Sequence, residues 1–363
     1  MLKRTPLYEE HRKLGAKLVD FGGWEMPIQY KSIIAEYQAV RSGVGVFDVS
    51  HMGEVEISGE GALELVQHLV SNDVAALKVN QVLYSPLCYP NGMTVDDLLV
   101  YRRPEQYLLV VNADNTPKDL AWIKGQAERF PQAQVRDASL DYGQLAIQGP
   151  EAAQALQPFI EYDLARISYY WAVEIELQGQ AALVSRTGYT GEDGFEVYAS
   201  PRATVRLWQD LLAAGVAPVA LGARDALRLE AAYALYGNEL DEQTTPIEAG
   251  LGWTVKDKKG DYNGKEVLLR QKREGGRKAL IGFRMIQAGV PRYGYPIFVA
   301  GREVGQVTSG MKSPKLDAYL GLGYLPWEAS RQVGERVQIE VRGQHKQAEL
   351  VKLPFYRGSV HQH

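Results

Sequence analysis

QVLYSPLCYPNGMTVDDLLVYRR, residues 81 to 103, contains two apolar runs separated by Pro-Asn-Gly. Two such runs joined through a short Gly-containing turn are typical of a β-hairpin. A hairpin pairs its strands antiparallel, so this stretch argues against an all-parallel sheet. Two adjacent aspartates, Asp96 and Asp97, lie inside the second run, where a carboxylate is costly unless it has a partner. The stretch therefore predicts an antiparallel sheet and a candidate functional position.

The flanking segments extend this pattern. VGVFDVSHMGEVEIS predicts two strands broken at SHMG, and Ser32 is expected to cap the helix that precedes them. Residues 172–200 predict one long hairpin whose second arm is rich in turns, followed by helices near 201–214 and 222–233. Hairpins mixed with helices favour an α+β fold over a doubly wound parallel sheet.

The chain changes character after a charged stretch at 256–278, which we interpret as a solvated helix and linker. Beyond Arg277, short strands alternate with turns and almost no helix is expected. This part predicts a separate antiparallel β-barrel of about 85 residues.

Composition excludes several classes of function. The 363 residues carry a formal net charge of −4, which does not favour binding to a nucleic acid. No apolar run approaches the roughly 18 residues of a membrane span, and no segment resembles a signal peptide or a mitochondrial presequence, so a cytoplasmic location is expected. The single cysteine, Cys88, cannot form an intramolecular disulfide, and the six histidines show no metal-ligand spacing with carboxylates, so no metal is expected.

The two aspartates must diverge if residues 93–103 form a strand. Alternation places Asp97 on one face with Val95, Leu99 and Tyr101, and Asp96 on the other with Thr94, Leu98 and Val100. Both faces are largely apolar, and desolvation would raise a carboxyl pKa and suit it to acid–base chemistry. The alternative is structural, with one carboxylate accepting backbone N–H groups and the other facing water.

Two further segments combine glycines or a helix start with functional side chains. In SRTGYTGEDGFEVY, residues 185–198, three glycines allow a close backbone approach to a ligand, and Tyr189 and Glu196 flank them. In LGARDALRLEAAY, residues 221–233, Arg224 lies in the first turn of a predicted helix, where the dipole disfavours a cation unless an anion is near. The alternatives are a tight double turn for the first segment and an ion pair for Arg224, with Asp225, Glu230 or another domain. The 21 tyrosines suit a flat heteroaromatic ligand.

Eight motifs together resemble the T-protein family of the glycine cleavage system. Each motif alone is weak, but their order is specific and they span essentially the whole chain. They are TPLYEEHRKLGAKLVDFGGWEMPIQY, VGVFDVSHMGE, DDLLVY, VVNA, QGP, SRTGYTGEDGFE, LGARDALRLEA and PFYRGS.

The resemblance implies a three-domain cloverleaf of α+β class, with two discontinuous α+β domains with antiparallel sheets and a C-terminal antiparallel β-barrel. The first domain would comprise residues 1–52 and 138–245, the second 53–137 and 246–276, and the barrel 277–363. The implied activity is that of an aminomethyltransferase. It transfers the methylene carbon of the aminomethyl group on the dihydrolipoyl arm of H-protein to tetrahydrofolate, giving 5,10-methylenetetrahydrofolate, ammonia and dihydrolipoyl H-protein. The implied partners are lipoylated H-protein and tetrahydrofolate as co-substrate, with no metal, nucleic acid or membrane.

The resemblance also implies roles for individual residues. Asp97 is similar to the family's catalytic aspartate, and Asp96 is expected to be structural and to tie the PNG turn. The expected folate-binding residues are Tyr84, Tyr101, Val110, Asn112, Tyr169, Tyr189, Glu196, Arg224, Arg357, Met52 and Trp253. Among these, Arg224 and Arg357 are expected to meet the glutamate-tail carboxylates or the linker of folate.

Two alternative functions share this fold. Folate-binding proteins of iron–sulfur cluster assembly carry a cysteine in a K-G-C-Y-x-G-Q-E segment, whereas this chain reads KGDYNGKE, with Asp261 and Lys265 at the departures. Folate-dependent demethylase modules are normally fused to a flavin domain with a dinucleotide fingerprint, which this chain lacks. A smaller departure is Met93, where many relatives have a second glycine before the two aspartates.

Overall fold

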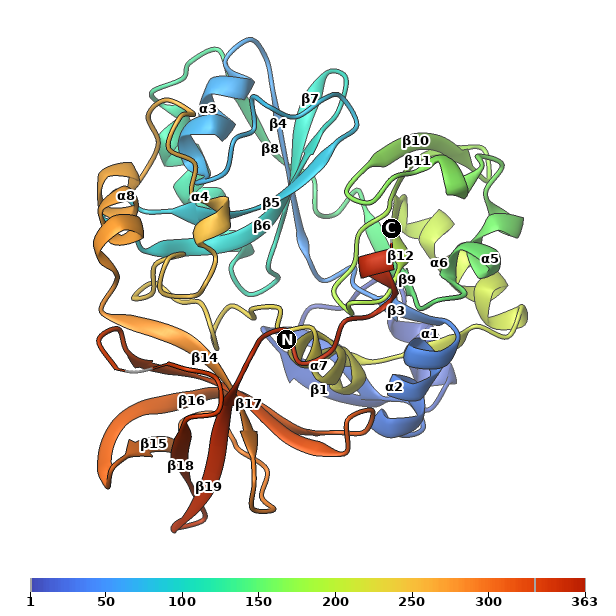
Figure 1. Ribbon diagram of the computed structural model, residues 1–363. Helices are drawn as coiled ribbons and strands as arrows, with labels where there is room; N and C mark the ends of the chain where they lie inside the picture. Colours follow the sequence, from blue (N-terminus) through green and yellow to red (C-terminus); the bar gives the residue numbers. More distant parts are fainter. Residues whose placement is uncertain (1, 330, 363) are drawn as a thin grey trace.

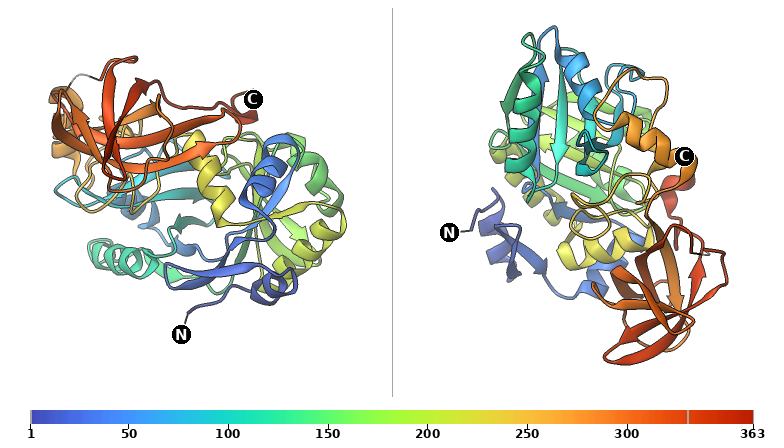
Figure 2. Two further views of the ribbon diagram at one scale, coloured as in Figure 1. Left: turned by 90° about the horizontal axis from the view of Figure 1, so that it is seen from below. Right: turned by 90° about the vertical axis from the view of Figure 1, so that its left-hand side faces the viewer.

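Three groups of elements surround a common centre in the computed structural model, which describes residues 2–329 and 331–362 (Figure 1). Two groups combine helices with a sheet, and the third is a closed barrel. Figure 2 shows the same groups from two other sides, with the barrel, orange to red, at the edge of the molecule. The predicted α+β class is confirmed.

The first group is built on a six-stranded sheet that is antiparallel except at one edge, where β13 pairs parallel with β3. In order across the sheet, its strands are β10 (Ala172–Leu177), β11 (Gln180–Ser185), β12 (Gly194–Ala199), β9 (Gly143–Gln148), β3 (Gly45–Asp48) and β13 (Ala217–Val219). The prediction of one long hairpin at 172–200 is wrong, because the chain reverses twice. Gln178 and Gly179 have φ of 54° and 78° at the first reversal, and the loop 186–193 makes the second.

Helices and a small N-terminal hairpin cover this sheet. They are α1 (Tyr8–Lys13), β1 (Lys17–Phe21), β2 (Trp24–Gln29), α2 (Ile33–Ser42), α5 (Ala152–Leu156), α6 (Pro201–Ala213) and α7 (Leu221–Glu230), with 3-10 turns at Gln157–Phe159 and Leu164–Arg166. The predicted cap of α2 is confirmed, since Ser32 accepts a hydrogen bond from Ala35 N at 3.1 Å. Helix α6 buries Leu207, Trp208 and Leu211 against the sheet, so its apolar stripe supplies much of this core.

The second group is a five-stranded antiparallel sheet with three helices. In order, its strands are β5 (Val82–Cys88), β6 (Thr94–Arg102), β7 (Gln106–Val111), β4 (Gly53–Ser58) and β8 (Gln134–Asp137), and its helices are α3 (Ala62–Leu69), α4 (Thr116–Ala127) and α8 (Lys265–Glu274), with a 3-10 turn at Gly252–Thr254. The predicted hairpin at 81–103 is confirmed as β5–β6. Its register shifts beside Val95, because Leu87 pairs with Asp96 and Cys88 pairs with Thr94.

This bulge corrects one sequence prediction. Val95 packs in the core with Leu98 and Val100, so it does not share a face with Asp97. A bulge inserts one extra residue and resets the alternation of faces. From Asp96 onward the predicted alternation holds, and Asp96 is fully buried whereas Asp97 is partly exposed.

The third group is the predicted antiparallel β-barrel. Its strands close in the order β14 (Lys278–Met285), β17 (Ala318–Pro326), β16 (Arg302–Ser313), β15 (Pro296–Val299), β18 (Arg336–Val341) and β19 (Gln344–Val351), and a 3-10 turn, η4, lies at Ser359–Gln362. The stretch 256–278 does form a helix, α8, but Lys259 is buried and its Nζ donates to Val70 O at 2.5 Å and Asn72 O at 2.7 Å. The interpretation as wholly solvated is therefore wrong at that residue.

We propose the predicted domain limits, 1–52 with 138–245, 53–137 with 246–276, and 277–363. Each sheet draws its strands from one of these parts, which supports the division. The chain nevertheless returns across it at the end. The C-terminal segment leaves the barrel and docks on the first group, where Tyr356 N donates to Glu230 O at 2.9 Å (Figure 1).

Candidate functional site

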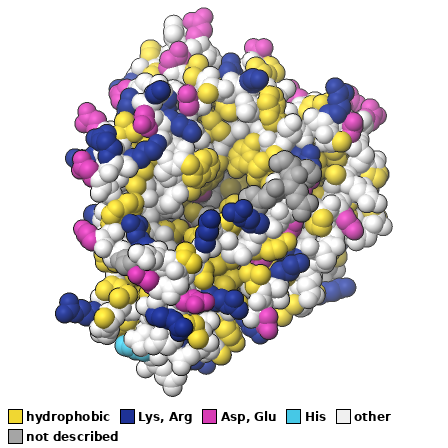
Figure 3. All heavy atoms as spheres, viewed as in Figure 1, with side chains coloured by type: hydrophobic (Ala, Val, Ile, Leu, Met, Phe, Trp, Pro, Cys, Tyr) yellow, Lys and Arg dark blue, Asp and Glu magenta, His cyan; other side chains and the backbone are white. Residues whose placement is uncertain are grey.

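The molecule is hollowed near the centre of the face seen in Figure 3. Hydrophobic side chains surround the hollow, and Lys and Arg side chains stand at its rim. This is where the three groups of Figure 1 approach one another. A hollow with apolar walls and a few polar groups is the usual form of a small-molecule site.

Asp97 is held by residues from the two strands that flank its own. Its Oδ2 accepts a hydrogen bond from the Tyr84 hydroxyl at 2.9 Å, and its Oδ1 accepts from Asn112 Nδ2 at 3.0 Å. Tyr84 lies on β5, and Asn112 directly follows β7. The order β5-β6-β7 therefore brings together three predicted site residues that are up to 28 positions apart in the sequence.

The environment of Asp97 changes its acidity. Burial, and secondarily the charge of Asp96, raise the pKa of Asp97 to about 7, although the hydrogen bonds from Tyr84 and Asn112 act in the opposite direction. At neutral pH both protonation states are populated. A carboxyl group in that condition can accept or return a proton efficiently.

Asp96 has a structural role, as predicted, but with different partners. It accepts hydrogen bonds from Asn112 N at 3.0 Å, Asn112 Nδ2 at 2.8 Å and Asn115 Nδ2 at 2.7 Å. The PNG turn is held instead by Asn91, whose Oδ1 accepts from Met93 N at 3.1 Å. The expectation that Asp96 ties this turn is wrong, because its side chain faces the residues that lead into α4.

Aromatic rings form two flat surfaces near the aspartate. Tyr84 stacks with Trp253, with ring centroids 6.0 Å apart and an interplanar angle of 26°, and Trp253 is 58% exposed. Tyr189 stacks with Tyr233 at 5.8 Å and 24°, and Tyr169 hydrogen-bonds to the same Tyr233. Offset-stacked rings of this kind can receive a flat heteroaromatic ligand.

Glu196 is a buried carboxyl with two donors. Gln144 Nε2 donates to its Oε1 at 3.1 Å and the Thr187 hydroxyl to its Oε2 at 2.5 Å. Burial raises the pKa of Glu196 despite these bonds. The position is suited to accept from, or donate to, a polar ligand edge.

Three predicted site residues lie in the packing between the two sheets. Tyr101 is 1% exposed and bonds to the Tyr198 hydroxyl at 2.8 Å, and Val110 is 4% exposed in the same cluster, against which Met52 packs. Their ligand-accessible surface is therefore small. These three side chains therefore pack behind the residues that line the candidate site and contribute little surface to it themselves.

Arg224 is a half-buried cation that forms no salt bridge among the described residues, although the charge of Glu196 acts on it. Its guanidinium lies 4.7 Å from the Tyr189 ring centroid, and among the described residues it forms no ion pair. The ion-pair alternative applies to Arg228 instead, which contacts Asp225 at 2.8 Å. Burial lowers the pKa of Arg224, and an anionic ligand would offset that burial. Arg357 is exposed in the C-terminal segment.

The glycine-rich loop 186–193 is tied to the C-terminal segment. Gly191 has φ of +79°, which favours glycine, and its carbonyl accepts from Val360 N at 3.4 Å. Glu192 accepts from Ser359 Oγ at 2.8 Å and pairs with Arg41 at 2.9 Å. The loop that carries Tyr189 is thus clamped from two sides.

Sequence reasoning missed several residues of this site. Tyr233 and Gln144 were not identified, although Tyr233 stands in the tyrosine-containing segment that follows α7. His51 was not singled out either. It is buried, its Nδ1 has no hydrogen-bond partner among the described residues, and burial together with the charge of Arg224 lowers its pKa to about 4.

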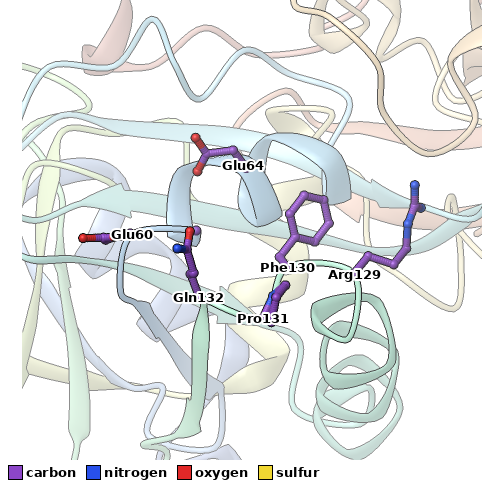
Figure 4. Close-up of a pocket in the computed structure, with 7 residues that line it drawn as sticks. Glu60, Glu64, Arg129, Phe130, Pro131 and Gln132 are labelled. Carbon is purple, nitrogen blue, oxygen red and sulfur yellow. The ribbon is translucent and has the colours of Figure 1, made fainter.

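Asp97 lines neither of two other hollows, of which one, of about 370 Å³, is lined by Asn115, Lys118, Tyr236, Asp241, Glu242 and Gln243. The other, of about 260 Å³, lies beside α3 and α4, where Figure 4 shows Glu60, Glu64, Arg129 and Phe130 without a convergent set of polar groups. Residues 2–329 and 331–362 contain no group of three or more His, Cys, Asp or Glu side chains that could hold a metal ion. In the same part of the chain, no helix is long and apolar enough to cross a membrane.

Comparisons with known proteins identify the family. The profile of the GCVT N-terminal domain matches residues 7–259, and that of the glycine cleavage T-protein C-terminal barrel domain matches residues 278–357. An aminomethyltransferase of Desulfitobacterium hafniense (strain DSM 10664 / DCB-2) is 50% identical over 361 residues, covering 98% of each chain. The aminomethyltransferase of Bacillus subtilis (strain 168) is 46% identical, covering 98% of this chain and 100% of that protein.

A solved structure agrees with these matches. The crystal structure of glycine cleavage system aminomethyltransferase T from Bartonella henselae is 34% identical, with a TM-score of 0.92, covering 98% of this chain and 99% of that one. Full-length similarity at this level extends to all three groups of elements. The chain therefore belongs to the T-protein family of the glycine cleavage system.

Proposed function

We propose that this chain transfers the methylene carbon of the aminomethyl group on lipoylated H-protein to tetrahydrofolate, releasing ammonia and leaving dihydrolipoyl H-protein. The predicted enzyme class, aminomethyltransferase, is confirmed by the curated relatives. The observation that carries the residue-level proposal is the position of Asp97 between Tyr84 and Asn112, beside the Tyr84–Trp253 pair.

The chain's groups fit tetrahydrofolate as a co-substrate. The two stacked tyrosine-containing pairs offer flat apolar surfaces for a pterin, and Glu196 offers a buried carboxyl for its polar edge. Arg224, a half-buried guanidinium with no salt-bridge partner among the described residues, fits the carboxylate or linker end. The exposed Arg357 would meet the tail farther out.

Asp97 is proposed as the catalytic residue. Folate supplies the nitrogen nucleophiles and the H-protein arm supplies the carbon, so the protein's task is to orient both and to manage protons and positive charge. Asp97, with its pKa raised to about 7, can take a proton from the attacking amine or stabilise a cationic carbon as a carboxylate. Tyr84 and Asn112 fix its orientation in either case.

The remaining partner and location predictions stay predictions. Lipoylated H-protein and folate are proposed partners, and a cytoplasmic location without nucleic acid or metal remains an expectation. For docking an acidic H-protein we propose as candidates the basic side chains of 256–278 and Arg292, for which solvated surface is the alternative. Lys259 is not among these docking candidates, because it is buried and its Nζ donates to two backbone carbonyl groups.

One reconstitution tests the proposal. The purified chain is incubated with aminomethylated H-protein and tetrahydrofolate, and ammonia and 5,10-methylenetetrahydrofolate are measured. We expect both products in equal amounts, and we expect the Asp97→Asn variant to bind folate but to release neither. Folate binding by the natural chain without ammonia release would instead support the iron–sulfur cluster assembly alternative.

A further inference from the structure

Asp119 is a buried carboxyl group that the mechanism above does not use. It lies in the first turns of α4, its side chain is 0% exposed, and neither of its oxygens has a hydrogen-bond donor among the described residues. An ionised carboxylate in that condition would be strongly destabilising. The Asp119 side chain is therefore expected to be protonated, or to have a neighbour that stabilises its charge.

The groups around Asp119 explain its state. Asp96 faces it from β6, Asp97 acts on it through its charge from the other face of that strand, and Lys118 lies on its own helix. Tyr89 and Tyr236 lie near it on other segments, and Glu242 pairs with Lys118 at 3.9 Å. Among the described residues Lys118 forms no salt bridge with Asp119, since its Nζ donates to Val95 O at 2.6 Å and to the Tyr236 hydroxyl at 2.8 Å, although its charge does lower the pKa of Asp119. The Asp96 carboxyl group is the neighbour to which a protonated Asp119 can donate. Asn115 Nδ2 donates to Asp96 Oδ1 at 2.7 Å, and Asp119 lies one helical turn beyond Asn115, with its N donating to Asn115 O at 2.8 Å.

Two adjoining carboxyl groups away from water do not both ionise. The donors decide which one carries the charge. Asp96 accepts from Asn112 N, Asn112 Nδ2 and Asn115 Nδ2, whereas no N–H group of the described chain reaches Asp119. Asp96 is therefore the carboxylate and Asp119 the acid, and burial together with the Asp96 charge raises the pKa of Asp119 to about 11.

We propose that Asp119 is a positioning residue for the transfer reaction: as a neutral carboxylic acid it donates a hydrogen bond to Asp96, which in turn holds Asn112 against Asp97. This inference rests on the catalytic role proposed for Asp97. Asn112 Nδ2 is the link, since it donates to Asp96 Oδ1 at 2.8 Å and to Asp97 Oδ1 at 3.0 Å. Loss of the Asp119 donor would leave Asp96 held only by Asn112 and Asn115, so the orientation of Asp96, and of the Asn112 side chain bound to it, would be less firmly fixed.

The proton on Asp119 also limits the charge behind the catalytic residue. With Asp119 neutral, Asp96 is the one carboxylate of this pair, and its charge already raises the pKa of Asp97. A second carboxylate there would raise it further and keep Asp97 protonated at neutral pH. Asp119 would thus set both the orientation of Asp97 and the pH at which it acts.

Two substitutions separate this role from simple packing. Asp119→Asn is neutral and its amide can donate to Asp96, whereas Asp119→Leu has a similar size and cannot donate. We expect Asp119→Leu to lower kcat by about 10-fold or more, the size typical of losing an outer partner of a functional group, and to shift the pH–rate profile. We expect Asp119→Asn to recover kcat to within about 3-fold with the natural pH profile. A natural kcat in Asp119→Leu would overturn the proposal, and so would an acid shift of the profile in Asp119→Asn, because it would show that Asp119 is ionised.

A measurement on the resting protein tests the protonation state without any substrate. The infrared spectrum at pH 8 should contain a protonated-carboxyl band that is absent from Asp119→Asn. Glu54 is another buried carboxyl whose pKa is raised well above its usual range, so Glu54→Gln serves as the matched assignment control. An identical band in the natural protein and Asp119→Asn would overturn the proposal. This result would not depend on Asp97, so the two proposals can fail separately.

Discussion

Replacing Asp97 with Asn should stabilise the folded protein at alkaline pH while it abolishes transfer. The carboxyl group is held where its charged form is disfavoured, since its pKa is raised from 3.8 to about 7 by burial and by Asp96. In the unfolded chain the same group ionises at its ordinary pKa. Folding is therefore opposed by this group whenever the pH exceeds about 4, and the opposition grows until the pH passes about 7.

The magnitude follows from the pKa difference. At about 1.4 kcal/mol for each pH unit, the change from 3.8 to about 7 corresponds to at most about 4 kcal/mol of stability above pH 7. In the Asp97→Asn variant, the new side chain would keep an acceptor for Tyr84 but would present an amide where Asn112 Nδ2 now donates at 3.0 Å, a loss of about 1–2 kcal/mol. The expected result is a net gain of roughly 2–3 kcal/mol at pH 8 and a net loss of roughly 1–2 kcal/mol at pH 4, where the charge of Asp97 no longer opposes folding.

Thermal unfolding from pH 4 to 9 measures this difference directly. The unfolding midpoint of Asp97→Asn should lie slightly below that of the natural protein at pH 4, rise relative to it between pH 4 and 7, and then stay a constant amount above it. Lys124→Gln, exposed on α4 of the same group of elements, provides a control whose effect should not vary over this pH range. A midpoint difference that does not vary with pH, or a variant less stable than the natural protein at pH 8, would show that Asp97 is not a disfavoured charge.

Three further predictions concern the surrounding residues. Arg224→Gln should weaken folate binding by about 10-fold or more without loss of stability, because Arg224 has no ion pair to lose among the described residues; calorimetric titration measures it, with the exposed Arg202→Gln as control. Ser359→Ala should raise the folate Kd by about 3-fold or more, because it removes the hydrogen bond to Glu192 that holds the loop 186–193. Lys352→Ala, in the same C-terminal segment, should leave the Kd unchanged, and equal Kd values for the two variants would contradict a link between this segment and folate binding. Cys88 should resist a thiol reagent at pH 8 until the protein unfolds, because burial raises the pKa of its thiol to about 12; rapid modification of the native protein would contradict the packing around it.

The alternation of side chains along a strand predicts those features of the site that depend on one strand alone. It separated Asp96 from Asp97 correctly, because the two residues are adjacent in one strand and must face opposite sides. It failed at Val95, since a bulge depends on how the partner strand is paired and not on the residues of one strand. The partners of Asp96 were wrong for a related reason: Asn112 and Asn115 reach it only once β7 lies beside β6.

Contacts between distant segments explain what the sequence did not show. Asp119 reads as an ordinary first-turn acid of α4, a position that the helix dipole favours. Only the assembled sheet places it against Asp96 and removes every donor of the described chain from its reach. The family resemblance did supply Arg224, yet the absence of an ion partner among the described residues, which makes it a candidate anion-binding group, is a property of the packed structure.

Three carboxyl groups lie close together near the centre of this protein, and the hydrogen-bond donors around them determine which of the three is ionised. Asp96, Asp97 and Asp119 lie together, and the N–H donors of Asn112 and Asn115 go mainly to Asp96. The charge is therefore placed on the residue that cannot touch a ligand, while Asp97 remains close to the protonation midpoint at neutral pH. If donors were added to Asp97 instead, its pKa would fall and it would become a poorer base. The carboxyl group proposed as reactive, Asp97, has fewer N–H donors than Asp96, and the stability and pH experiments would measure the consequence of this difference.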